Sequence, residues 1–103
     1  MKDYISAAHL AERLAKTNPP LLLDVRIGQI GQIPGAKHVP VLDLEDYPGQ
    51  WDRDSEIVVF CQFGKGASEY AAEVLHEQGY HRVLKLVGGM DGWSQYLNSL
   101  KEG

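Results

Sequence analysis

The sequence contains only one cysteine, Cys61, among its 103 residues. A single thiol excludes an internal disulfide and any metal site built from several thiolates. The four histidines, His9, His38, His76 and His81, show no ligand spacing of the H-E-x-x-H kind, so we expect no bound metal and no other cofactor. The absence of disulfides is typical of a reducing compartment, and the expected location is the cytoplasm.

Positive charge and long apolar runs are also scarce. Ten Lys and Arg residues stand against 14 Asp and Glu residues, which gives a net charge of −4 and an isoelectric point near 5.4. Neither a nucleic acid nor a membrane is therefore expected as the main partner, because an anionic surface would favour a basic face. No apolar run approaches the length that spans a bilayer, and the charged segment 1–16 does not resemble a signal peptide. The length fits a single domain over residues 1–103.

Two short, continuous apolar runs, residues 21–25 and 56–60, predict strands that are buried on both faces. Weaker extended segments occur at residues 3–5, 38–39 and 82–87. Strands buried on both faces are typical of a parallel sheet that is covered by helices on each side.

Helical patterns separate the predicted strands. The predicted helices span residues 7–16, 42–47 and 68–78 and the segment after Asp91, which is a candidate N-cap. Ser6 is a candidate N-cap of the first helix, and Gly79 is a candidate C-terminal cap of the third. In the last helix, apolar residues recur at i, i+3, i+4 and i+7, so Trp93 and Tyr96 are expected to pack in the core. The alternation of strands and helices predicts a three-layer α/β domain with a central, mostly parallel sheet of about five strands.

The segment CQFGKGAS, residues 61–68, lies between a predicted strand and a predicted helix. Such a turn points consecutive backbone N–H groups at one place, and Gly64 and Gly66 permit the backbone angles that it needs. The start of the helix adds partial positive charge. This cradle would lower the pKa of the Cys61 thiol and stabilise a thiolate or a persulfide, and Lys65 would add to the effect with an inward ammonium group. A lone cysteine at the end of a buried strand is also typical of a small core residue, so both interpretations stay open at this point.

Four segments together resemble the single-domain rhodanese-like sulfurtransferases. They are LLLDVR at 21–26, IPGAKHVPV at 33–41, VVFCQFG at 58–64 and GYHRVLKLVGGMDGW at 79–93, and the likeness extends from Tyr4 to Tyr96. The resemblance implies a three-layer α/β/α rhodanese-like fold. It also implies a sulfurtransferase in which a cysteine takes sulfur from a thiosulfate-like donor as a persulfide and passes it to cyanide, a thiol or a protein acceptor.

The resemblance assigns roles residue by residue. Cys61 is the nucleophile in this comparison. The substrate-binding cradle consists of Gln62, Phe63, Gly64, Lys65, Gly66 and Ala67. Asp24 and Arg26 match the family's Asp-Val-Arg and are expected to support the loops around the site, together with Ser68.

Two departures from the family pattern concern this site. The piece between Arg26 and Ile33 is shorter, lacks a Glu-Phe pair and has Gln32 where a histidine is common, so the rim of the site is expected to differ. Compared with the common pattern C-x-x-G-x-R-S, one extra residue lies between Gly64 and Ser68, and the arginine is absent. The cradle is therefore expected to be wider and to lack a bidentate anion grip that lysine cannot replace.

These departures leave two alternatives. One is a binding or redox-sensing module of the same fold, in which Cys61 is a switch or carries sulfur to a specific partner. The other is a cysteine-dependent phosphatase or arsenate reductase with the pattern C-x5-R. Ala67 stands at the position of that arginine, so phosphoryl transfer would lack its main charge partner and is disfavoured.

Overall fold

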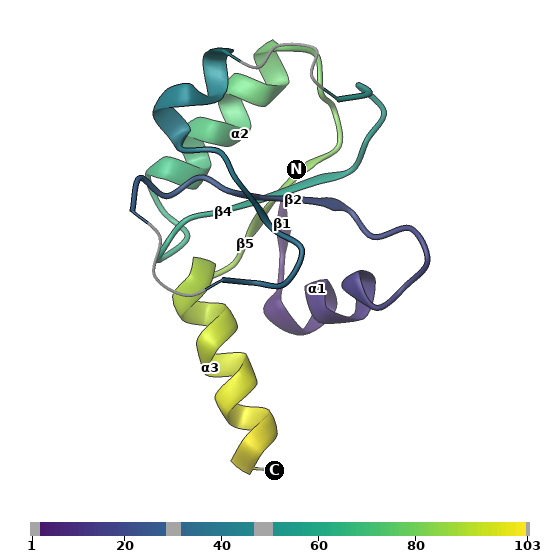
Figure 1. Cartoon of the computed structure of the whole chain (residues 1–103), viewed down its shortest axis with the longest axis vertical. Helices are drawn as coiled ribbons and strands as arrows, with labels where there is room; N and C mark the ends of the chain where they lie inside the picture. Colours follow the sequence, from purple (N-terminus) through teal and green to yellow (C-terminus); the bar gives the residue numbers. More distant parts are fainter. Residues whose placement is uncertain (1–2, 29–31, 47–50, 103) are drawn as a thin grey trace.

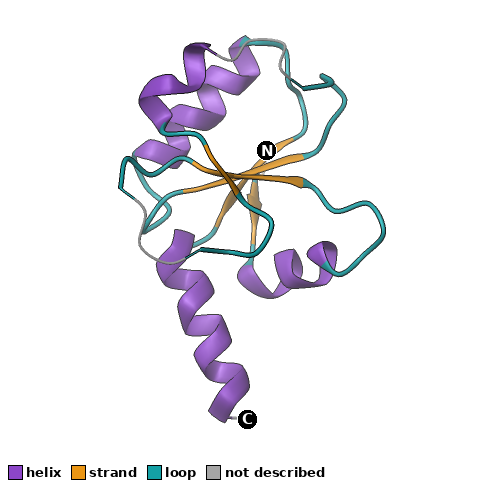
Figure 2. Ribbon diagram, viewed as in Figure 1, coloured by secondary structure: helices purple, strands orange, loops and turns teal. Residues whose placement is uncertain are grey.

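The computed structural model describes residues 3–28, 32–46 and 51–102, and it places helices on both sides of one twisted sheet (Figure 1, Figure 2). The elements are β1 (Tyr4–Ile5), α1 (Ala7–Leu14), β2 (Leu21–Asp24), β3 (Lys37–His38), the 3-10 helix η1 (Val41–Asp46), β4 (Ile57–Phe60), α2 (Ala67–Glu77), β5 (Val83–Leu86) and α3 (Gly89–Glu102). The strand order is β1-β5-β4-β2-β3, and every strand pair is parallel. The predicted three-layer α/β fold with a five-stranded parallel sheet is therefore confirmed.

The two central strands, β2 and β4, are the two runs that the sequence predicted to be buried. Their alternate side chains enter two different cores because successive residues of a strand point to opposite faces. Leu23 and Val59 join the core beneath α2 and η1, whereas Leu22 and Val58 join the core beneath α1 and α3. Burial on both faces explains why these strands are apolar at every position except the last residue of β2.

Capping residues set the ends of two helices as the sequence predicted. The Ser6 hydroxyl accepts a hydrogen bond from the N–H of His9, at 3.1 Å, and so caps α1. Gly79 follows α2 with a φ of +100°, a conformation that glycine reaches without a steric penalty. The N–H of Tyr80 then returns to the carbonyl of Leu75, at 3.0 Å, and closes the end of the helix.

The last helix, α3, differs from its prediction. It begins at Gly89, so Asp91 lies in its first turn and is not its N-cap. Its C-terminal half extends away from the sheet (Figure 1). Trp93 is buried as predicted and Tyr96 is half-buried, but Leu97 and Leu100, which continue the same stripe, are exposed.

The second predicted helix is a 3-10 helix in the structure. The short helix predicted at residues 42–47 is the 3-10 helix η1, and position 47 lies outside the described residues. In residues 3–28, 32–46 and 51–102, no helix has the length and hydropathy that crossing a bilayer requires.

Candidate active site

The carboxyl ends of β2 and β4 meet at one edge of the sheet and bring three candidate residues together. The two strands are hydrogen-bonded neighbours with Asp24 opposite Phe60. Cys61 follows β4 directly, and Arg26 lies two residues beyond the end of β2. The carboxyl ends of parallel strands are where ligands bind in α/β folds. These residues lie at one edge because the two strands are parallel and adjacent.

Cys61 is 5% exposed and lines a cavity of about 570 Å³. The cavity is lined by Arg26, Ile27, Gly28, Cys61, Gln62, Phe63, Lys65 and Ala67. Five of the seven residues predicted for the nucleophile and its cradle therefore line one cavity. Gly64 and Gly66 belong to the same loop but do not line it. Ser68 is fully buried behind the sulfur.

Hydrogen bonds make the Cys61 sulfur more acidic than an ordinary thiol. Burial alone raises the pKa of Cys61, because it disfavours the charged form. The Ser68 hydroxyl, whose Oγ lies 3.4 Å from Sγ, lowers the pKa, and so do the backbone N–H groups of Ser68, Gly64 and Phe63. The lowering effects are larger in sum, so the pKa of Cys61 is below its ordinary value. A partly ionised thiol in a cavity can act as a nucleophile at neutral pH.

One contact of the Cys61 sulfur favours the neutral thiol and not the thiolate. The carbonyl oxygen of Lys65 lies 3.1 Å from Sγ and accepts the S–H of the neutral thiol. The cradle that the sequence predicted from N–H groups therefore also contains an acceptor. No sequence signal indicates which way a peptide in such a loop turns.

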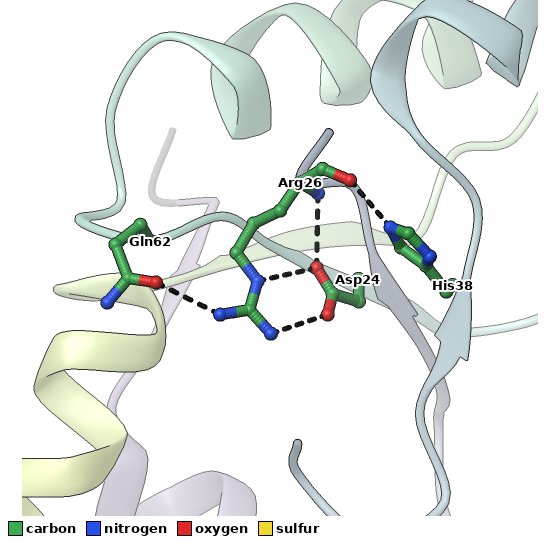
Figure 3. A network of polar contacts seen from close by, with 4 residues as sticks. All are labelled: Asp24, Arg26, His38 and Gln62. Atoms are coloured by element: carbon green, nitrogen blue, oxygen red, sulfur yellow. Dashed lines mark hydrogen bonds and ion pairs between the residues drawn. The ribbon is translucent and has the colours of Figure 1, made fainter. Parts of the chain in front are cut away.

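The Asp24 and Arg26 side chains form a buried ion pair next to the cavity (Figure 3). Arg26 donates from Nε to Oδ1 and from Nη2 to Oδ2 of Asp24, at 2.9 and 2.7 Å. The backbone N–H of Arg26 also donates to Asp24 Oδ1, at 3.1 Å. The hydrogen bond to Asp24 raises the pKa of Arg26, and the nearby Cys61 charge contributes in the same direction. The guanidinium is therefore a fixed cation beside the thiol.

Two further contacts extend this network across the site. Nη1 of Arg26 donates to Oε1 of Gln62, at 2.9 Å, and His38 Nε2 donates to the carbonyl oxygen of Arg26, at 2.6 Å (Figure 3). The guanidinium also lies over the Phe60 ring, 5.7 Å from its centre. Because Gln62 follows Cys61, the network connects the cysteine loop to the end of β2.

The start of α3 supports the loop from the other side, a role that sequence reasoning missed. The N–H groups of Met90 and Asp91 donate to the carbonyls of Cys61 and Gln62, at 2.8 and 2.9 Å. A Cβ on Gly64 would lie 2.8 Å from the nitrogen of Gly88, and one on Gly89 would overlap the Cys61 carbonyl oxygen. Gly88 lies in a turn, and Gly89 and Met90 already belong to α3. The signal in the sequence was the glycine pair that directly follows a predicted strand.

Besides the cavity at Cys61, a site among the described residues could be a metal site or a second cavity with a nucleophile. No group of three or more His, Cys, Asp or Glu side chains in residues 3–28, 32–46 and 51–102 could hold a metal ion. A larger cavity, of about 660 Å³, opens near Arg13 and Glu56 at the amino-terminal end of the strands. Its lining contains no cysteine, and Arg13 and Glu56 pair with each other. The cavity above Cys61 is therefore the candidate site.

A family model described as a rhodanese-like domain matches residues 6–96. The chain belongs to the rhodanese-like family. A protein of Allochromatium vinosum named sulfurtransferase is 35% identical over 100 residues, which cover 93% of this chain and 92% of the relative. The thiosulfate sulfurtransferase GlpE of Coxiella burnetii is 30% identical over 97 residues, 90% of each chain.

Solved structures show the same rhodanese-like fold. The human single-domain sulfurtransferase TSTD1 superimposes with a TM-score of 0.82 at 26% identity, and the match covers 92% of this chain and 97% of that one. A rhodanese-like domain protein from Staphylococcus aureus has a TM-score of 0.80 at 27% identity, with coverage of 90% and 91%. The relatives named here that span nearly the whole domain thus support a sulfurtransferase.

Proposed function

We propose that the chain is a sulfurtransferase that carries sulfane sulfur as a persulfide on Cys61. The observation that carries the proposal is the Cys61 thiol itself, which has a lowered pKa and lines a cavity beyond the carboxyl end of β4. The thiolate attacks the outer sulfur of a thiosulfate-like donor. The S–S bond of the donor breaks, and sulfite leaves with its electron pair while Cys61 retains the sulfur as Cys–S–S⁻. An acceptor nucleophile then takes that sulfur and returns the thiolate.

Two cationic side chains that line the cavity favour the binding of an anionic sulfur donor. Arg26 contributes a guanidinium that Asp24 holds in place, and Lys65 lines the cavity from the loop. Lys65 forms no ion pair with any carboxylate in the described parts of the chain, so its charge is available to a ligand. A relative named thiosulfate sulfurtransferase supports thiosulfate as the donor class. Ala67, at the start of α2, occupies the place of the C-x5-R arginine, so hydrolysis of aryl phosphates and reduction of arsenate are not expected.

The mass of the protein tests this proposal directly. After incubation with thiosulfate, the intact protein is expected to gain one sulfur atom, and Cys61→Ser is expected to gain none. Transfer from thiosulfate to cyanide should be lost in Cys61→Ser and retained in Ser99→Ala, whose exposed hydroxyl lies on α3. No mass gain on Cys61, with cyanide transfer that survives Cys61→Ser, would contradict the proposal.

The rim of the cavity favours a second candidate, in which the domain delivers sulfur to a cysteine of a partner protein. Ile27 and Phe63 line the cavity while their side chains are 69% and 66% exposed. Thiosulfate and cyanide make little use of apolar walls. An apolar residue next to an acceptor cysteine would bury part of both side chains, and each Å² removed from water contributes about 25 cal/mol. The charge of Lys65, which no carboxylate among the described residues pairs with, complements a carboxylate on the same segment.

Peptide acceptors separate the two candidates. A short peptide with a cysteine between phenylalanine and glutamate is compared with one that has serine and lysine at those positions, and with cyanide. We expect Phe63→Ala to slow transfer to the first peptide about fivefold, from the apolar area that it no longer buries, and to leave transfer to cyanide unchanged. Leu42→Ala is the matched control, because Leu42 is 73% exposed but does not line the cavity. Equal losses for all three acceptors would contradict the partner-directed role.

A further inference from the structure

The peptide group between Lys65 and Gly66 is held at both of its ends. Its carbonyl oxygen accepts the S–H of Cys61, with 3.1 Å between oxygen and sulfur. Its N–H, which belongs to Gly66, donates to Oε1 of Glu69, with 3.2 Å between nitrogen and oxygen. The C=O and N–H of a trans peptide lie in one plane and point in opposite directions. Glu69 therefore fixes which of the two groups faces the sulfur.

The observed orientation suits a neutral thiol and not an anion. A thiol can donate its S–H to the carbonyl, whereas a thiolate or a persulfide anion can only accept hydrogen bonds. In the anionic state, the Lys65 oxygen would face the negative sulfur with its lone pairs. The N–H groups of Phe63, Gly64 and Ser68 stabilise the anion from their own positions. One group of the cradle thus has the wrong polarity for the reactive form of the site.

Gly66 makes a reversal of this peptide sterically possible. Its φ is +68°, and no atom outside its chain neighbours lies within 4 Å of the place where a Cβ would be. The peptide turns over when ψ of Lys65 and φ of Gly66 change together, which brings φ of Gly66 to negative values. Glycine adopts positive and negative φ about equally well. The peptide also lies between Gly64 and Ser68, where the sequence has one residue more than the common family pattern.

We propose that the Lys65–Gly66 peptide turns over when Cys61 becomes an anion, so that the Gly66 N–H faces the thiolate or the persulfide, and that Glu69 is the positioning residue that holds the carbonyl-inward form. The two anions, Glu69 and the sulfur, compete for one N–H donor. Glu69 is exposed and stays hydrated when it loses that donor. The persulfide part of this inference rests on the proposed function, whereas the thiolate part requires only that Cys61 ionises.

Alkylation of Cys61 by iodoacetamide tests the inference without any sulfur transfer. Its rate is measured against pH for the full chain and for Glu69→Ala, Glu69→Gln and Glu69→Asp. Because Glu69→Ala releases the Gly66 N–H, it is expected to lower the pKa of Cys61. Its alkylation rate below that pKa should rise about tenfold, the effect of one additional hydrogen bond to a charged group.

The other two variants separate the hydrogen bond from the charge of Glu69. Glutamine keeps an oxygen acceptor at the same reach and removes the charge, whereas aspartate keeps the charge but is one methylene shorter. We expect the alkylation profile of Glu69→Gln to stay close to that of the parent protein, and the profile of Glu69→Asp to approach that of Glu69→Ala. The charged groups around the cradle, Arg26 from the segment after β2 and Lys65 from the loop, are the same in all four proteins. The reverse order, or four identical profiles, would overturn the inference, and circular dichroism of each variant checks that α2 is intact.

A crystal structure of the chain after reaction with thiosulfate examines the peptide directly. The Gly66 N–H is expected to face the outer sulfur, with the Lys65 carbonyl turned toward solvent. A persulfide with the carbonyl still facing it would overturn the inference. If no persulfide forms, the proposed function fails, and the alkylation profiles decide the thiolate part by themselves.

Discussion

Nη1 of Arg26 donates a hydrogen bond to Oε1 of Gln62, 2.9 Å away, and joins the residue after Cys61 to the end of the neighbouring strand. The same guanidinium is bound by both carboxylate oxygens of Asp24. Arg26 is 6% exposed and Asp24 is fully buried. The buried Asp24–Arg26 ion pair therefore links the cysteine loop to the end of β2.

Loss of the Asp24 charge is expected to destabilise the fold. Asp24→Asn leaves a buried guanidinium without its counter-ion, which costs about 3 kcal/mol of unfolding free energy. The matched control is Glu56→Gln, which weakens the partly exposed pair with Arg13 and should cost about 1 kcal/mol or less. Urea denaturation measures both. Equal losses for the two variants would show that the burial of the Asp24–Arg26 pair is not what makes it important.

Removal of the Ser68 hydroxyl is expected to raise the pKa of Cys61. That hydroxyl is one of the groups that lower it, so in Ser68→Ala a smaller fraction of the thiol is ionised at neutral pH. The alkylation rate at pH 7 should fall about fivefold, which corresponds to about 1 kcal/mol for one hydrogen bond to the anion. Ser99→Ala on α3 is the control for a lost serine hydroxyl. An unchanged or lower pKa in Ser68→Ala would contradict the role of this contact.

The lowered pKa of Cys61 also predicts how stability depends on pH. Between the folded pKa and the unfolded value of about 8.5, the unfolded chain binds more protons at Cys61 than the folded chain does. The free energy of unfolding therefore gains a contribution as pH rises through this window, and it loses that contribution as pH falls through the folded pKa. The difference in stability between the parent and Cys61→Ser should grow with pH there. A difference that is flat or falls with pH would contradict the sign of the shift.

An added methyl group on Gly64 is expected to be more harmful than one on Gly35. Both glycines have a positive φ, +80° and +85°, so alanine is strained at either position. Only at Gly64 would the new Cβ also meet another backbone, 2.8 Å from the nitrogen of Gly88, whereas Gly35 has open space. Gly64→Ala should lose at least about 1 kcal/mol more unfolding free energy than Gly35→Ala, within the range known for overpacking. Thermal denaturation of both variants measures this difference, and equal losses would show that the contact with α3 relaxes freely.

Much of the arrangement of strands and loops around the site was predictable because it depends on strong local patterns in the sequence. Two apolar runs predicted the central strands, and the loop between a strand and a helix predicted an anion cradle around Cys61. The family resemblance assigned Asp24 and Arg26 to the same site and residues 62–67 to the cradle, and the structure places Gln62, Phe63, Lys65 and Ala67 around one cavity.

The parts that the sequence did not reveal depend on contacts between distant segments. The first turn of α3 is completed by the carbonyls of Cys61 and Gln62, so this helix starts two residues before the capping aspartate that the sequence suggested. Helical periodicity identified the stripe of Leu97 and Leu100, but it does not show how far the sheet extends beneath a helix. The direction of the Lys65 carbonyl depends on the hydrogen bond from the Gly66 N–H to Glu69, a contact that the sequence pattern did not reveal.

The contact between Gly64 and the Gly88–Gly89 pair has a consequence for protein engineering. In its observed shape, the cysteine loop packs against a second backbone that has no side chain at the point of contact. A transplant of residues 61–67 alone into another parallel sheet would leave the carbonyls of Cys61 and Gln62 without their N–H partners. The smallest portable unit is therefore discontinuous, and it consists of the loop together with the strand end and first helical turn at residues 86–91.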